Sequence, residues 1–142
     1  FPEIELWVDA GIATETECHP WTAKTNIRLV MGSETLRDLS LPKRLNCILS
    51  LDFHGDTFLG DPNLLKDASF WPQEIIVMTL ERVGSACGPA YKQLKALMAR
   101  AGEKQIYAAG GVRNMDELYA LVSLGIAGAL VATALHSGTI TP

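Results

Sequence analysis

The sequence lacks the features that mark several large classes of protein. Its Lys and Arg residues are scattered, and a formal net charge of −4 offers no basic surface to nucleic acid or an anionic membrane. No signal peptide is visible. The most apolar stretch, Ile126 to Leu135, is interrupted by Gly128 and is far shorter than the roughly 20 residues of a bilayer span. We therefore expect neither a nucleic-acid partner nor a membrane.

Cysteine is scarce and carries no recognisable pattern. Cys18, Cys47 and Cys87 form no CxxC pair and no metal-ligand spacing, and their number is odd. Reduced, buried thiols in a cytoplasmic protein are the expected state. No carboxylate cluster accompanies the histidines, so we predict no metal site, and we expect no cofactor.

What is present is the composition of one globular domain. The 142 residues are 48% hydrophobic and 20% charged, which predicts a single packed domain over residues 1–142. The chain begins at Phe1 without an initiator Met and stops at Pro142 just beyond an apolar run. Both ends are therefore expected to be cuts through a longer protein.

Short apolar runs recur every 20 to 30 residues or so, the length of one strand-plus-helix unit. They are mostly free of charge, as strands buried on both faces of a parallel sheet are. The six runs are Ile4–Val8, Ile27–Met31, Cys47–Leu51, Ile75–Met78, Ile106–Ala109 and Ala129–Ala132. The clearest helical patterns between them are Pro89–Ala101 and Asn114–Leu124, and Glu15–Lys24 and Pro62–Phe70 are weaker.

Such units build either an open doubly wound sheet or a closed (β/α)8 barrel. An open nucleotide-binding sheet usually carries GxGxxG after its first strand, and none is present. The sequence therefore favours an α/β fold of the (β/α)8 TIM-barrel type. Six strands do not close such a barrel, so we expect it to be N-terminally incomplete, with strands three to eight present. We also expect the chain to need the missing N-terminal strands or to self-associate.

Polar and small residues follow the apolar runs at one end only. Asp9, Asp52 and Thr79 come directly after buried runs, and barrel enzymes build their sites at the carboxyl ends of the strands. Asp52 can serve as a general acid or base, because burial moves a carboxyl pKa towards neutrality. The alternative is that it caps the following loop. Asp9 and Arg82 are candidates for substrate contact, and Thr79 either contacts substrate or simply ends a strand.

Two pairs of glycine-containing strand ends predict phosphate-binding loops, because bare backbone N–H groups at helix starts bind anions. One pair comprises Gly11 with Gly32 and Ser33. The other comprises Gly110 and Gly111 with Ala132 and Thr133. A pair at each side of the site indicates a small substrate phosphorylated at both ends.

A family resemblance rests on four segments: Leu49 to Gly55, Arg82 to Ser85 with Gly88-Pro89, Ala109 to Val112, and Gly128 to Val131 with Ala134-Leu135. Together they resemble the histidine-biosynthesis ribotide isomerases, (β/α)8 barrels that perform an Amadori rearrangement on a substrate with two phosphates. The resemblance implies that Asp52 and Thr79 are catalytic residues of strands five and six, and that the two glycine sets hold the phosphates. It also implies that a further catalytic aspartate lies on strand one, outside this chain.

The sequence departs from the family pattern at two places. Asp9-Ala10-Gly11-Ile12-Ala13 stands where the isomerases have Gly-Gly-Gly-Ile-Arg, and Thr79 is followed by Leu80 instead of Asp. This indicates a divergent isomerase-related protein. The leading hypothesis is an isomerase of a small phosphorylated metabolite, ribotide-like or sugar-phosphate-like, with Amadori-type aldose–ketose chemistry. The alternatives are a non-catalytic phosphometabolite-binding barrel, or a lyase or synthase on the same scaffold in a cofactor-biosynthesis pathway.

Overall fold

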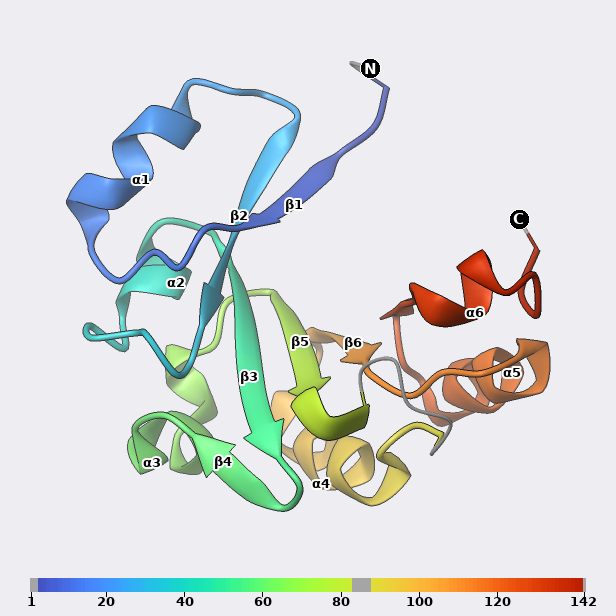
Figure 1. The fold of residues 1–142 in the computed structure, drawn as a ribbon. Coiled ribbons are helices and arrows are strands. Elements are labelled where there is room, and N and C mark those ends of the chain that lie inside the picture. The colour runs from blue at the N-terminus through green and yellow to red at the C-terminus, as the bar shows by residue number, and fades with distance from the viewer. Residues whose placement is uncertain (1–2, 83–87, 142) are drawn as a thin grey trace.

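The computed structural model describes residues 3–82 and 88–141 of the chain as an α/β structure (Figure 1). The strands are β1 (Leu6–Asp9), β2 (Ile27–Gly32), β3 (Ile48–His54), β4 (Thr57–Leu59), β5 (Glu74–Thr79), β6 (Gln105–Ala109) and β7 (Gly128–Leu130). The helices are α1 (Glu15–Thr22), α2 (Leu41–Arg44), α3 (Pro62–Lys66), α4 (Tyr91–Ala101), α5 (Met115–Leu124) and α6 (Thr133–His136). Short 3-10 turns cover Ala68–Phe70 (η1) and Leu80–Arg82 (η2).

The sheet has the order β1-β2-β3-β5-β6-β7, and each of these neighbours is parallel. All six predicted strands are therefore confirmed, in sequential order. The segment 62–70, predicted as one helix, is divided into α3 and η1. The predicted strand Ala129–Ala132 is shifted, because β7 ends at Leu130 and Ala132 already precedes α6.

The sheet is strongly curled. The rings of Trp7 on β1 and Tyr107 on β6 meet edge to face, with centroids 4.8 Å apart. In a flat sheet these strands, four positions apart in the order, would lie about 19 Å from each other. The contact is possible only across a concave face, so the sheet forms a parallel half-barrel.

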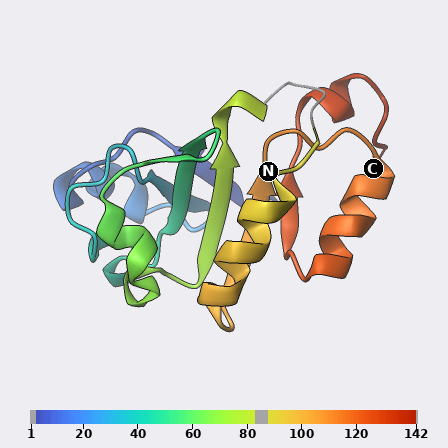
Figure 2. The same ribbon diagram turned by 90° about the horizontal axis from the view of Figure 1, so that it is seen from below.

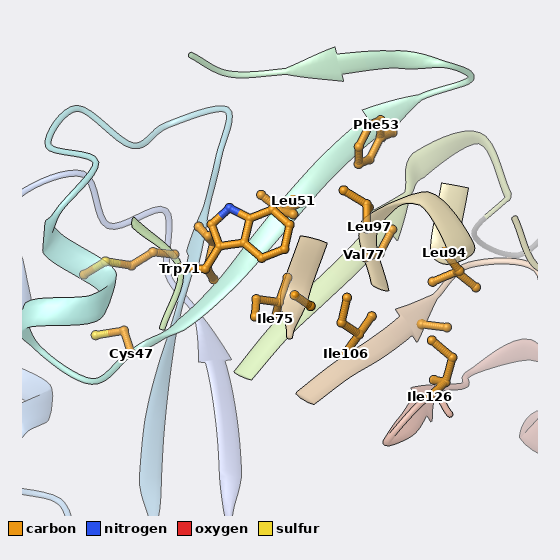
Figure 3. Close-up of a cluster of buried hydrophobic side chains, with 14 of the residues drawn as sticks. Cys47, Leu51, Phe53, Trp71, Ile75, Val77, Leu94, Leu97, Ile106 and Ile126 are labelled. Atoms are coloured by element: carbon orange, nitrogen blue, oxygen red, sulfur yellow. The ribbon is translucent and has the colours of Figure 1, made fainter. Parts of the chain in front are cut away.

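Helices α1 to α5 contribute to the core on the outer, convex side of this sheet (Figures 1 and 2). Leu94 and Leu97 of α4 lie against Val77 and Ile106 of the sheet (Figure 3). Trp71 is fully buried in the same core, and its indole N–H donates to the Leu64 carbonyl at 2.6 Å. This packing fixes one face of every strand.

The concave face holds the other set of side chains, as the two-residue alternation of a strand requires. A second, separate core of Val30, Ile48, Ile76 and Ala109 lies there. On β3 the alternation assigns Leu49, Leu51 and Phe53 to the helices and Ile48, Ser50 and Asp52 to the concave face. The following argument depends on this assignment.

The amino-terminal end of the concave face is closed by charge pairing. Arg28 of β2 reaches across β3 to Glu74 of β5, with its Nη1 donating to Oε1 at 3.0 Å. This hydrogen bond, more than the accompanying charge, lowers the pKa of Glu74, although burial opposes it. Charged groups thus pair at the amino-terminal end of this face, whereas Ser50 and Asp52 lie towards the carboxyl end of β3.

The sequence predicted neither the short helix α2 nor the antiparallel strand β4. It pairs with β3 through Asp52↔Leu59, Phe53↔Phe58 and His54↔Thr57, and the two phenylalanine rings lie 5.3 Å apart. The two-residue turn begins with Gly55 at φ +60°. A Gly-Asp turn between aromatic residues is a recognised hairpin signal.

The outer strands β1 and β7 have no neighbour on one side within the described sheet. Leu6 on β1 is 46% exposed and Leu130 on β7 is 37% exposed. We expect the isolated 142-residue chain to self-associate through these edges, because unpaired apolar edge strands pair with whatever is available. Light scattering after size exclusion should show species larger than a monomer.

The matched variants are Leu6→Lys, which places a charge on the edge, and Val122→Lys, which places one on the exposed face of α5. Only Leu6→Lys should reduce the association. A cooperatively folded, monodisperse monomer of the parent chain would contradict this prediction.

Candidate functional site

Asp52 lies near the carboxyl end of β3 with its side chain on the concave face. The Ser50 hydroxyl donates to Oδ1 at 2.6 Å, and the backbone N–H of Glu34 also donates to the carboxylate. Ser33 Oγ lies 3.5 Å from Oδ2. The carboxylate is therefore held by groups from two neighbouring strands.

Gly32 leaves the space that this carboxylate occupies. A Cβ atom at Gly32 would lie 2.9 Å from Asp52 Oδ2, closer than a real Cβ contact. The glycine predicted to bind phosphate thus allows an internal carboxylate to approach the end of β2.

The environment raises the pKa of the Asp52 carboxyl above its ordinary value. Burial raises the pKa of its carboxyl above the ordinary value, and the negative charges of Asp9 and Glu34 add to this. The hydrogen bonds from Ser50 and the Glu34 amide act in the opposite direction. A carboxyl group with a raised pKa exchanges protons closer to neutral pH than an exposed aspartate does.

Ser33, the second predicted phosphate ligand at the end of β2, donates both its hydroxyl and its backbone N–H to acceptors within the fold. Its hydroxyl donates to the Leu59 carbonyl at 2.6 Å, and its N–H donates to the Ser50 carbonyl at 2.8 Å. The residue is buried. It ties the β3–β4 hairpin to the end of β2, and it presents no donor to a phosphate in this arrangement.

Gly11 and Asp9 follow the same pattern at the end of β1. The Gly11 N–H donates to Asp9 Oδ1 at 3.1 Å. Asp9 is exposed, and its charge is felt at Asp52. At the first predicted phosphate pair, the Gly11 N–H thus donates to a carboxylate and the Ser33 N–H to a carbonyl of the chain itself.

Thr79 does not lie beside Asp52. Ile76 and Met78 of β5 face the concave side, so the alternation turns Thr79 towards the helices, where its hydroxyl lies 3.5 Å from Gln93 Oε1 of α4. Asp52 pairs in register with Met78 instead. The Thr79 hydroxyl thus lies towards α4 in this structure, and a catalytic role for Thr79 stays a prediction.

Gly110 and Gly111 follow β6 at a point where another segment passes close by. A Cβ at Gly110 would lie 2.6 Å from the Thr79 carbonyl oxygen, and one at Gly111 would lie 2.3 Å from that of Gly88. Both glycines have positive φ, +105° and +82°. Close packing against the backbone of Thr79 and of Gly88 accounts for this Gly-Gly pair.

The start of α5, just beyond these glycines, is occupied by an internal anion. Glu117 accepts from the backbone N–H of Arg113 at 2.7 Å and pairs with the Arg113 guanidinium, while Asn114 Oδ1 accepts from the Glu117 N–H. Burial opposes the charge of Glu117, but the hydrogen bonds and charge of Arg113 together lower its pKa. The first turn of α5 is therefore already capped.

Ala132 and Thr133 differ from the other predicted phosphate residues in this respect. They lie at the start of α6, both are exposed, and no side chain caps this helix. The preceding strand β7 is paired with β6, with Leu130 opposite Ala109. The ends of these two strands are therefore adjacent, as the sequence predicted.

Arg82 lies in η2, and its Nη1 donates to the Gly88 carbonyl at 2.7 Å. It also borders a cavity of about 300 Å³ with Gly55, Glu81 and Gln93. The residues 83–85 of the family motif and Cys87 lie outside the described part of the chain.

The structure also bears on the expectations for metal binding, for a membrane span and for the cysteines. Within residues 3–82 and 88–141, no His, Cys, Asp and Glu side chains gather in a group able to hold a metal ion, and no helix is long and apolar enough for a bilayer crossing. Cys18 and Cys47 are free and buried, and burial raises the pKa of Cys47 to about 11. Cys47 is therefore a protonated thiol at neutral pH.

The close approach at Gly111 generates a testable prediction. Gly111→Ala and Gly138→Ala both force alanine into positive φ, +82° and +74°, at a cost of roughly 1–2 kcal/mol each. Only Gly111→Ala also creates a collision, since nothing lies within 4 Å of a Cβ at Gly138. We expect Gly111→Ala to lose about 1–3 kcal/mol more. Denaturant unfolding of both variants measures the difference, and equal losses would refute the account of Gly111.

Comparison with known proteins finds an uncharacterized protein and several isomerases among the relatives of this chain. An uncharacterized protein of Methanocaldococcus jannaschii is 28% identical over 142 residues, covering 96% of this chain and 62% of that protein. An imidazole-4-carboxamide isomerase of Bacillus licheniformis, whose name carries two 5-phosphoribosyl groups, is 26% identical over 160 residues, covering 98% and 64%. An isomerase of the same name from Herpetosiphon aurantiacus is 39% identical over 66 residues, covering 46% and 27%. The chain thus spans less than two thirds of the length of these relatives.

The model of one protein family, described as histidine biosynthesis protein, matches residues 67–141. The match begins at the end of α3 and includes β5, β6, β7 and the helices that follow them. It covers more than half of the chain, and the curled parallel sheet and the isomerase relatives agree with it. The chain belongs to the histidine biosynthesis protein family, as a divergent member.

Proposed function

We propose that this chain supplies strands three to eight of a (β/α)8 barrel that isomerises a small phosphorylated metabolite, with Asp52 as a proton-transfer group. The observation that carries the proposal is the placement of Asp52. It is a carboxyl group with a raised pKa, on the concave face, at the carboxyl end of the central strand β3.

The chemistry needs a group that both takes and returns a proton. In an Amadori-type aldose–ketose isomerisation, one carbon next to the reacting C=N or C=O group loses a proton and its neighbour gains one. A carboxylate within reach of that carbon removes the proton, and the resulting acid returns it. A partly buried aspartate with a raised pKa is suited to both steps. The family resemblance implies a second catalytic aspartate on strand one, which is outside this chain.

Phosphate binding is proposed at the ends of β6 and β7, through Gly110, Gly111, Ala132 and Thr133. Two features support this location over the ends of β1 and β2. The start of α6 has no capping side chain, although the N–H groups of Leu135 and His136 donate to the Ala132 carbonyl. By contrast, Gly11 and Ser33 donate to internal acceptors, and Asp9 and Glu34 make that side acidic. The second phosphate is therefore expected to depend on groups outside the predicted set.

A non-catalytic barrel that binds a phosphorylated metabolite is the second candidate. The observation in its favour is Met78, an apolar side chain paired in register with Asp52 where a polar catalytic partner was expected. In either case we propose that the half-barrel works with further strands, from the same protein or from a second copy.

Substitution of Asp52 separates the two candidates. Asp52→Asn preserves the size of the side chain, but it removes the group that takes and returns the proton. If the protein is an isomerase, turnover of a phosphoribosyl-type substrate by the full-length protein should fall by about 10²-fold or more, while affinity for the substrate changes little.

Turnover is measured by following the isomerisation of the substrate directly, and the affinity of the protein for the substrate is measured by calorimetry. Asp38→Asn, a surface substitution next to Ser40, is the control that leaves both quantities unchanged. Turnover of Asp52→Asn within a few-fold of the parent would refute proton transfer by Asp52. Binding without turnover in the parent protein would favour the non-catalytic candidate.

A further inference from the structure

We infer that Ser50 is a positioning residue for Asp52, which holds its carboxylate against the end of β2 so that it faces the concave side in one fixed orientation. The inference rests on the proposed role of Asp52 and deepens it. The sequence alone assigned no role to Ser50 beyond its place in the segment Leu49 to Gly55.

The strand geometry places Ser50 for this purpose. It lies two residues before Asp52 on β3, so both side chains project from the same face. The residue is only 2% exposed, and the single proton of its hydroxyl is donated to Asp52 Oδ1 at 2.6 Å. A buried hydroxyl that gives its one proton to a carboxylate makes a charge-assisted hydrogen bond, the stronger kind.

The opposite side of the carboxylate is limited by the backbone. Oδ2 lies where a Cβ at Gly32 would come within 2.9 Å, and the Glu34 N–H donates to the same carboxylate. The two oxygen atoms are thus held from different strands, Oδ1 by β3 and Oδ2 at the end of β2. Without Ser50, only the β2 side would restrain the rotation of the carboxylate about χ2.

The Ser50 bond also acts on the charge of Asp52. Burial and the charges of Asp9 and Glu34 favour the acid, whereas the Ser50 hydroxyl stabilises the carboxylate. Loss of the hydroxyl should therefore make Asp52 hold its proton to a higher pH. This sign distinguishes positioning from a merely structural role, because a packing defect has no reason to shift the titration of one carboxyl in a given direction.

The experiment compares Ser50→Ala with the parent in the full-length, assembled protein. Carbon-13 NMR of the Asp52 carboxyl group measures its titration directly, and the pH profile of turnover measures it a second time. We expect the acid dissociation constant of Asp52 to fall roughly tenfold, as loss of one charge-assisted hydrogen bond implies. The acidic limb of the profile should move to higher pH by the same amount. Ser123→Ala, which removes a hydroxyl bonded only to its own helix, is the control that shifts neither.

Gly32→Ala provides an independent variant, because it displaces Oδ2 and retains the Ser50 hydroxyl. If both residues act through the orientation of one carboxylate, the effect of Ser50→Ala should be smaller in the Gly32→Ala background than in the parent. Additive effects would refute the inference, and so would an Asp52 titration unchanged by Ser50→Ala.

Failure of the proposed function gives a different result. In that case the parent protein does not isomerise phosphoribosyl substrates, yet the NMR titration still responds to Ser50→Ala. If Ser50→Ala does not fold, the inference is tested by the titration of Asp52 in Gly32→Ala. A titration curve indistinguishable from that of the parent would overturn the inference.

Discussion

The contact between Trp7 and Tyr107 is the constraint on which the rest of the structure depends. By joining the first strand of the sheet to the fifth in spatial order, it requires the sheet to curl and divides every strand into a helix-facing side and a concave side. Because side chains alternate along a strand, that division decides which residues reach the site. Asp52 and Ser50 lie on the concave side with Met78, and Thr79 does not.

Internal carboxylates recur at the backbone donors of this site. Asp9 accepts from Gly11, Asp52 from the Glu34 amide, and Glu117 from Arg113. Glycines at strand ends therefore do not by themselves imply free donors for a phosphate. Gly32 and Gly111 are explained by close approach, of a carboxylate in one case and of a carbonyl in the other. Ala132 and Thr133, at the uncapped start of α6, remain proposed phosphate-binding residues.

The sequence was sufficient to predict the parallel strands and their order. Uninterrupted apolar runs such as Ile75–Met78 identify buried parallel strands, and the spacing of the runs gives their order. The placement of Asp52 near a carboxyl strand end followed from the same pattern. These predictions succeed because burial on both faces leaves a strong, local compositional signal.

The finer features depend on information that a single sequence does not carry. A one-residue uncertainty in strand parity reverses the direction of a side chain, so the sequence alone did not show that Met78 is the residue in register with Asp52. Strand β4 is only three residues long, and its Gly55-Asp56 turn was hidden within a presumed loop. The occupation of backbone donors by Asp9 and Glu117 depends on side-chain geometry, which spacing does not fix.

The central claim is that the carboxyl ends of the strands, on the concave side, form the site for a phosphorylated substrate. A crystal structure of the full-length protein with a bisphosphorylated ribotide tests it most directly. The account predicts one phosphate beside Gly111 and Thr133, with the sugar over the Asp52 carboxylate. A ligand bound on the helix-facing side, or at the amino-terminal end beside Arg28 and Glu74, would contradict it.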